Sequence, residues 1–226
     1  QMHLFYLHGF ASSAGSTKAA WLAERLAPFG LSLHCPDFNQ PDFHGLTTSR
    51  MIGQVDDAIA ALPSGPVVLI GSSLGGFVAW HAAARQSAAA ARRTPIERLV
   101  LLAPALDFGA NRRMGDLDAD GIDRWRDAGY LDVFHHAFGE TLRVGYELYS
   151  DAAGYDSFAV QDSDAPPTVI FQGRRDDAVD PAMVQRFSRG RAAVELHLLD
   201  DDHQLHDSLE LIWRRVVELL ELEPGA

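Results

Sequence analysis

The stretch PVVLIGSSLGGFVA at residues 66–79 most constrains the fold of this chain. A run of apolar residues is followed by a segment rich in glycine and serine, and then by small residues in a pattern typical of a helix. Residues 71–75 fit G-x-S-x-G, in which a serine occupies a strained turn between a strand and a helix. Glycines are needed there because the backbone folds back too tightly for side chains. The stretch predicts a strand–turn–helix unit that raises Ser73 above the edge of a sheet.

Other kinds of glycine-rich turn lack their required residues here. A phosphate-binding loop has Lys followed by Ser or Thr after its second glycine, and a dinucleotide site has G-x-G-x-x-G with an acidic residue about 20 positions on. Neither pattern is present at residues 71–76. A plain tight turn is the remaining alternative. The apolar strand before residues 71–76 and the helical FVAWHAAA after them favour a nucleophilic serine.

Short apolar runs alternate with helical patterns along the chain, an order typical of parallel βα units. Apolar residues recur at helical spacing over 52–62 and again over 209–219. Most of the short runs are continuously apolar, as strands covered on both faces are. The predicted strands are residues 3–7, 31–35, 67–70, 98–102, 168–172 and 193–199. The sequence predicts an α/β fold, with a mostly parallel sheet of about six strands and helices on both faces.

Helix ends carry their own signals. Ser or Asp before an apolar run is typical of an N-cap, and proline is favoured in the first turn of a helix. Asp180 followed by Pro181 has this pattern. Asp207 and Glu210 have the spacing of a capping box at the last helix.

A serine hydroxyl becomes a nucleophile when a base accepts its proton, so Ser73 requires a histidine and an acid that orients it. In this kind of sheet both follow later strands, the acid first and the histidine second. The strand at 168–172 runs into GRRDDAVDP. We expect Asp176 to be the acid and keep Asp177 in reserve.

The expected base is His203, in the loop between the last strand and the last helix. His197 falls within the strand and His206 at the start of the helix, where structural roles are expected. His203-x-x-His206 beside three aspartates has some likeness to a metal site. No third group of ligands supports it, so no metal and no cofactor are predicted.

An oxyanion hole takes one N–H from the residue after the nucleophile and one from a loop after an early strand. Leu74 supplies the first. The second is expected from Phe10 in YLHGFASS, where Gly9 gives the backbone its shape beside the substrate. His8 is expected to be tied into hydrogen bonds of the loop.

The fragments HGF, GSSLGG, GRRDDAVDP and DDHQL in this order resemble the α/β-hydrolase superfamily over nearly the whole chain. YLHGFASSAGSTKA followed by GSSLGGFVA resembles, more narrowly, the small bacterial esterases called YqiA-like. The resemblance implies a single-domain serine carboxylesterase over residues 1–226. Its implied residues are Ser73 as nucleophile, Asp176 as acid, His203 as base, and the amides of Phe10 and Leu74. Ser12, Ser13, Ser16 and Lys18 match the rest of the signature, and we expect them to shape the loop and cap the first helix.

Residues 106–167 are too long for a βα connection, which ordinarily takes about 2–6 residues. On an α/β-hydrolase this insertion follows the fourth strand and is expected over the carboxyl ends of the strands. Its aromatic residues predict a helical cap with an apolar underside, either as packing or as a substrate pocket. They are Trp125, Tyr130, Phe134, Phe138, Tyr146, Tyr149 and Tyr155. Trp125, Tyr130 and Tyr146 are taken as tentative substrate contacts.

Charge and cysteine usage exclude several classes of function. The chain has 19 basic and 31 acidic residues and a formal charge of −12, which disfavours nucleic acid and membrane surfaces as partners. A single cysteine, Cys35, forms no internal disulfide. No apolar run approaches the roughly 20 residues of a membrane helix, and QMHLFYLHGF does not resemble a signal peptide. A cytoplasmic location is expected.

The leading prediction is hydrolysis of short- to medium-chain carboxylic esters through an acyl-enzyme. The same machinery would cleave an acyl-CoA thioester, although the acidic charge disfavours that substrate. A more distant alternative is a non-catalytic module that binds a small ligand on the same fold.

Overall fold

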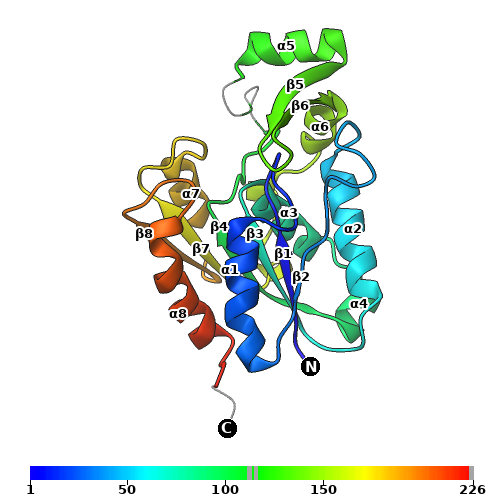
Figure 1. Ribbon diagram of the computed structural model, residues 1–226. Helices are drawn as coiled ribbons and strands as arrows, with labels where there is room; N and C mark the ends of the chain where they lie inside the picture. The colour runs from blue at the N-terminus through cyan, green and yellow to red at the C-terminus, as the bar shows by residue number, and fades with distance from the viewer. Residues whose placement is uncertain (111–113, 115–116, 224–226) are drawn as a thin grey trace.

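A computed structural model describes residues 1–110, 114 and 117–223. Its central sheet has six parallel strands in the order β2-β1-β3-β4-β7-β8 (Figure 1). The strands are β1 (His3–Leu7), β2 (Leu33–His34), β3 (Val67–Ser72), β4 (Ile96–Leu102), β7 (Thr168–Gly173) and β8 (Val194–Leu199). The predicted parallel sheet is confirmed, with β2 shorter than expected and β3 longer.

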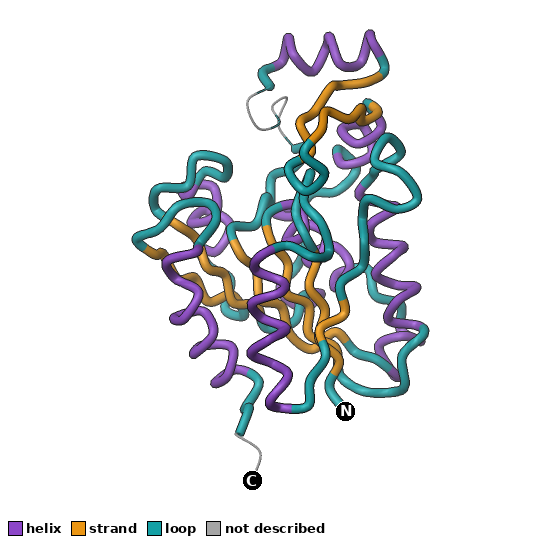
Figure 2. Tube along the Cα trace, in the orientation of Figure 1, coloured by secondary structure: helices purple, strands orange, loops and turns teal. Residues whose placement is uncertain are grey.

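Helices cover both faces of the sheet, as Figure 2 shows along the chain trace. One face packs against α1 (Thr17–Leu26) and α8 (Leu209–Leu219), through residues such as Leu22 and Ile212. The other packs against α2 (Thr48–Ala60), α3 (Leu74–Ala84) and α7 (Pro181–Ser188). A short α4 (Ala88–Arg93) precedes β4. The strands are therefore buried on both faces, which is why their sequences are continuously apolar.

The register of the strands brings the predicted site loops together. Leu7 at the end of β1 pairs with Gly71 of β3, and Gly71 pairs with Leu101 of β4. Gly173 at the end of β7 pairs with Leu199 at the end of β8. Because all these strands are parallel, the loops that follow them leave from one edge of the sheet.

Two of the three predicted helix caps form. Ser16 accepts from Ala19 N–H at the start of α1, and Asp180 accepts from Ala182 N–H with Pro181 in the first turn of α7. The predicted capping box at Asp207 and Glu210 is wrong. A 3-10 turn (His206–Ser208) precedes α8, and Ser208 makes no cap bond, because its hydroxyl donates to Asp201 instead, at 2.8 Å.

The insertion between β4 and β7 is only partly helical. It contains α5 (Ala119–Ala128) and α6 (Glu147–Ala152), with short 3-10 turns at Ser157–Ala159 and Asp162–Asp164. Between the two helices lies an unpredicted antiparallel hairpin, β5 (Tyr130–His135) and β6 (Glu140–Gly145). Figure 1 shows α5 and this hairpin at the end of the sheet away from the N-terminus, where β1 ends. Residues 106–110, which the insertion shares with the loop after β4, are described, but 111–113 and 115–116 lie outside the described residues.

In the described part of the chain, no helix is both long and apolar enough to cross a membrane.

Candidate active site

Ser73 occupies the junction between β3 and α3 with φ +54° and ψ −115°. A residue other than glycine seldom adopts this conformation, and it costs about 1–3 kcal/mol unless the surroundings hold it. Its N–H donates to Leu102 O at 2.9 Å, and its carbonyl accepts from Gly76 N–H and Ala105 N–H, both at 3.0 Å. The strained turn predicted from G-x-S-x-G is present.

The flanking glycines are required by close backbone approach. A Cβ on Gly71 would lie 2.4 Å from Gly75 O, and a Cβ on Gly75 would lie 2.0 Å from Leu7 O. Both distances are far below contact distance, so neither position tolerates a side chain without a backbone shift. The second distance also shows that the start of α3 lies directly against the end of β1.

The loop after β1 lies beside the serine. A Cβ on Gly9 would be 3.6 Å from Ser73 Cβ, and Ser12 N–H closes the loop onto Gly9 O at 3.3 Å. Leu74 is the first residue of α3, where helical N–H groups have no partner within the helix and carry partial positive charge. Within the described residues, neither Phe10 N–H nor Leu74 N–H donates a hydrogen bond.

Asp176 and His203 form a pair at the ends of the neighbouring strands β7 and β8. Asp176 Oδ2 lies 2.8 Å from His203 Nδ1, and the carboxylate is fully buried while the imidazole is 20% exposed. A carboxylate only accepts, so Nδ1 carries the proton and Nε2 keeps its lone pair in the neutral ring. This is the tautomer of a histidine that accepts a proton at Nε2.

The remaining hydrogen bonds of Asp176 keep it ionised. Its Oδ1 accepts from Ala178 N–H at 2.9 Å and Val179 N–H at 2.8 Å, and Oδ2 also accepts from Gln172 Nε2 at 3.0 Å. Burial raises the pKa of Asp176, but the bonds from His203, Val179 and Gln172 outweigh it and hold the pKa below its ordinary value.

The loop that carries His203 is fixed from several sides. A Cβ on Gly173 would lie 2.4 Å from Asp201 O, so glycine allows the acid loop and the histidine loop to touch. Asp201 accepts from Asp202 N–H and from the Ser208 hydroxyl. The buried Lys18 ammonium donates to Gln204 O at 3.1 Å. Lys18 thus anchors the loop that carries His203, besides lying in the first helix where the signature placed it.

Some of the predicted site residues do not contact one another in the structure. Within the described residues, Ser73 Oγ forms no hydrogen bond, with His203 or with any other group. Trp125 is 1% exposed, donates from Nε1 to Val144 O at 3.2 Å and packs edge-on against Tyr146 at 5.8 Å. Tyr130 lies under the guanidinium of Arg143, 4.0 Å from its ring centroid. Trp125 and Tyr146 thus pack within the cap, and substrate contact by the three aromatics stays a prediction.

Sequence reasoning missed two polar groups that the structure places at the site. Gln172 is the last residue but one of β7, is fully buried and donates to Asp176. A polar residue at the end of an apolar run was its only signal in the sequence. Asn39 holds the carbonyl of Ser12 in the loop after β1, at 2.8 Å. Nothing in the sequence connects residues so far apart.

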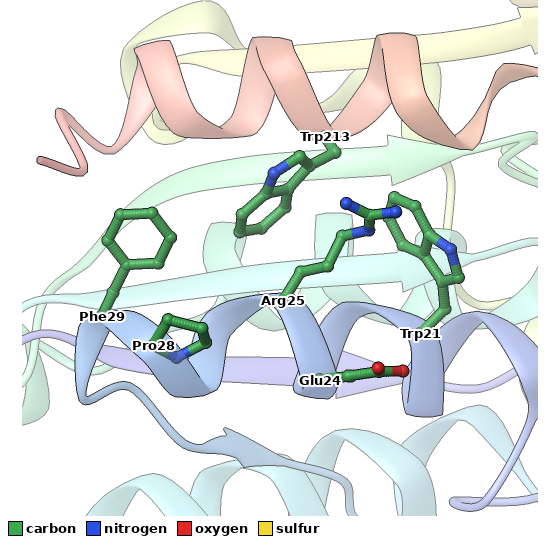
Figure 3. Close-up of a pocket in the computed structure, with 6 residues that line it drawn as sticks. All are labelled: Trp21, Glu24, Arg25, Pro28, Phe29 and Trp213. Carbon is green, nitrogen blue, oxygen red and sulfur yellow. The ribbon is translucent and has the colours of Figure 1, made fainter. Parts of the chain in front are cut away.

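A surface pocket of about 340 Å³ lies between α1 and α8 (Figure 3). The Trp21 ring that lines this pocket is covered by the Arg25 guanidinium, which lies 4.0 Å from the ring centroid and also pairs with Glu210. None of the predicted site residues lines it. As for metals, the described residues contain no group of three or more His, Cys, Asp or Glu placed to hold one.

Several solved structures are similar to this chain over nearly its whole length. Est1E from Butyrivibrio proteoclasticus, with ferulic acid bound, is 22% identical and matches 97% of this chain and 89% of its own, with a TM-score of 0.77. Mouse alpha/beta hydrolase domain-containing protein 10 is 18% identical over 97% and 89%, with a TM-score of 0.73. The monoacylglycerol lipase of Paleococcus ferrophilus is 16% identical over 96% and 93%, also with a TM-score of 0.73. These similarities confirm the predicted α/β-hydrolase fold.

A search of curated proteins finds no match to the chain. A family model does match, over residues 3–221. That range contains the complete sheet and every residue predicted for the site. The chain belongs to the uncharacterised protein family UPF0227.

Proposed function

We propose that this protein is a serine carboxylesterase that hydrolyses short- to medium-chain esters through an acyl-enzyme. The observation that carries the proposal is the strained Ser73, at a strand–helix junction of a sheet whose later strand ends hold the Asp176–His203 pair. The names of fold relatives support an ester as the bond cleaved, since they include an esterase and a monoacylglycerol lipase.

The first half of the proposed reaction forms the acyl-enzyme. Ser73 Oγ attacks the ester carbonyl while His203 Nε2 takes the hydroxyl proton, and Asp176 stabilises the imidazolium through Nδ1. The carbonyl oxygen becomes an oxyanion that accepts from Phe10 N–H and Leu74 N–H. The C–O bond to the alcohol then breaks, and the alcohol leaves with the proton from His203.

The second half releases the acid. Water attacks the acyl carbonyl while His203 Nε2 takes its proton, the same two amides hold the oxyanion, and the bond to Ser73 Oγ breaks as the proton returns to the serine. No metal or cofactor takes part in either half. Apart from the ester and one water molecule, the reaction needs only groups that the chain itself supplies.

Replacement of the nucleophile tests the proposal, with its neighbour as a matched control. Ser73→Ala should reduce kcat for p-nitrophenyl butyrate by about 10⁴-fold or more, because the attacking oxygen is gone. Ser72→Ala removes the same hydroxyl one residue earlier, from the end of β3, and should leave kcat within a few-fold of wild type. Activity retained in Ser73→Ala would show that another group performs the hydrolysis.

A further inference from the structure

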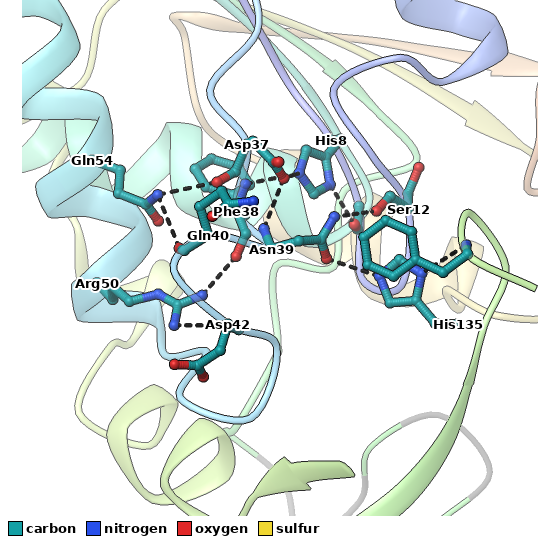
Figure 4. A network of polar contacts seen from close by, with 12 residues as sticks. His8, Ser12, Asp37, Phe38, Asn39, Gln40, Asp42, Arg50, Gln54 and His135 are labelled. Atoms are coloured by element: carbon teal, nitrogen blue, oxygen red, sulfur yellow. Dashed lines mark hydrogen bonds and ion pairs between the residues drawn. The ribbon is translucent and has the colours of Figure 1, made fainter. Parts of the chain in front are cut away.

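The tip of the β5–β6 hairpin is joined to the loop after β1 by a buried polar relay (Figure 4). We call residues 9–12 the oxyanion loop. Asn39 Nδ2 donates to Ser12 O of this loop at 2.8 Å, and Asn39 Oδ1 lies 2.8 Å from His135 Nε2 at the end of β5. Because the Asn39 Nδ2 group is the donor to Ser12, its Oδ1 is the acceptor, so His135 Nε2–H donates. The imidazole is fully buried and Asn39 is 7% exposed.

His135 is held in this orientation from its other side. Phe138 N–H donates to His135 Nδ1 at 3.3 Å, and the Phe138 ring stacks on the imidazole with centroids 4.0 Å apart. The rings of Phe43 and His135 lie nearly perpendicular, with centroids 5.0 Å apart. These contacts require a neutral histidine with its proton on Nε2. Burial and the neighbouring His136 lower the pKa of His135, against smaller opposing effects of its own backbone, Asp37 and Glu140.

Asn39 stands on a rigid support. Arg50 of α2 donates to Phe38 O at 2.6 Å and to Asp42 O at 2.9 Å, so the segment on either side of Asn39 is tied to the helix. Asn39 N–H donates to the Asp37 carboxylate at 2.9 Å. The backbone around Asn39 is therefore held by α2, independently of the two partners of the Asn39 side chain.

The oxyanion loop has a conformation that needs such support. Ala11 has φ +54°, which disfavours any residue with a Cβ. Ala11 O also accepts from Ala137 N–H of the hairpin tip, at 3.4 Å. His8 also holds this loop, because its Nδ1–H donates to Gly9 O at 2.9 Å while its Nε2 accepts from Phe38 N–H.

We propose that Asn39 and His135 are positioning residues for the oxyanion loop, so that the hairpin tip of the cap fixes the direction of the Phe10 N–H toward the oxyanion on Ser73. This inference rests on the proposed function. It assigns the cap a part in transition-state stabilisation besides covering the substrate. Neither residue touches the reacting atoms, and both act through the backbone of residues 9–12.

Paired variants of His135 test the relay. His135→Leu removes the donor to Asn39, whereas the side-chain amide of His135→Gln reaches the same acceptor. Loss of a whole oxyanion donor costs about 10²–10³ in kcat, so a misdirected donor in His135→Leu should lower kcat by about 10- to 100-fold. KM for p-nitrophenyl butyrate should change less than twofold, and His135→Gln should retain kcat within about fivefold. Phe134→Ala is the matched control, because Phe134 is 53% exposed on the same hairpin.

Asn39→Asp tests the other end of the relay at nearly constant shape. At pH 8 its carboxylate still accepts from His135 but places an oxygen where the donor to Ser12 O was. The expected loss in kcat is again about 10- to 100-fold. Because His135 keeps its acceptor, this variant should leave the hairpin docked, and it thus separates positioning from any unfolding of the cap in His135→Leu.

Hydrogen–deuterium exchange gives a readout that does not depend on activity. The amides of residues 8–13 should exchange faster in His135→Leu and Asn39→Asp than in wild type and Phe134→Ala. Wild-type kcat in both relay variants, or faster exchange limited to residues 130–145, would overturn the inference. If Ser73→Ala kept full activity, the proposed function would fail, and the exchange at residues 8–13 would still decide whether the relay holds the loop.

Discussion

At the scale of single residues, Asp176 and Asp177 are adjacent carboxylates that differ in burial and in hydrogen bonding. Asp176 is buried, with both carboxylate oxygens hydrogen-bonded, while Asp177 is exposed to solvent. From the sequence, either carboxylate was a candidate to orient the histidine. The structure brings only Asp176 into contact with His203.

Asparagine variants of the two aspartates should therefore behave differently. Asp176→Asn should lower kcat by about 10³- to 10⁴-fold, because the amide no longer stabilises the imidazolium or the required tautomer. Asp177→Asn should stay within about twofold of wild type. Equal losses in the two variants, measured with one ester at saturation, would contradict the assignment of the acid.

Asp176→Asn also tests how the free energy of unfolding depends on pH. The pKa of Asp176 is held below its unfolded value of about 3.9, so the stabilisation is present above that pH and is lost as the pH falls through the lower folded pKa. In urea unfolding, the stability difference between wild type and Asp176→Asn should be constant near neutral pH and shrink below about pH 4. A difference that grew on acidification would mean that the pKa shift has the opposite sign.

At the scale of elements, close backbone contacts set the geometry of the site. The ends of β7 and β8 touch because Gly173 has no side chain, as Gly75 has none where α3 meets β1. An added methyl group at either place would push apart the loops that carry the predicted catalytic groups. This is a constraint on backbone approach, and it is separate from the conformational freedom of glycine.

Gly173→Ala should accordingly destabilise the fold by about 1–3 kcal/mol and lower kcat, since Asp201 O must move and the His203 loop moves with it. Gly53→Ala in α2 is the control, because a Cβ there meets no atom within 4 Å and alanine favours a helix. Urea unfolding measures the first effect and steady-state kinetics the second. Equal behaviour of the two variants would show that the β7 and β8 loops are not in tight contact.

The parallel sheet and the strained turn at Ser73 could be predicted because their signals are local. These signals are the apolar runs of the strands, the glycines at 71 and 75 around Ser73, and an acid and a histidine after later strands. The hairpin could not be predicted. Aromatic residues four apart at Tyr130, Phe134 and Phe138 indicated a helix, while Leu131 and Val133 alternate as in a strand and pair with Val144 and Leu142. The relay from His135 to Asn39 joins residues 96 positions apart, which no local pattern reveals.

At the scale of the whole molecule, the net charge of −12 predicts a difference between ester and thioester substrates. A CoA thioester carries several negative charges, so the field of the protein repels it, whereas a neutral ester is unaffected. Salt screens this repulsion over about 10 Å at 0.1 M. Exposed Arg174 and Arg175 lie on the acid loop, but Arg175 is paired with Asp200 at 3.1 Å.

Raising the salt concentration from about 0.02 to 0.3 M should therefore increase kcat/KM for butyryl-CoA severalfold and leave that for p-nitrophenyl butyrate nearly unchanged. The two substrates share the acyl group, so the comparison isolates the CoA charge. A fall in kcat/KM for butyryl-CoA with salt would show a local attraction for the polyanion and favour the thioesterase.

The central claim is that Ser73 is an activated nucleophile, and covalent labelling tests it most directly. The protein is incubated with a small fluorophosphonate, and the intact mass and the peptide map are measured. The account predicts a single adduct, on the peptide that contains Ser73, and none in Ser73→Ala. A folded protein that takes up no label, or takes it up at another residue, would contradict the account and favour a module that binds a ligand without cleaving it.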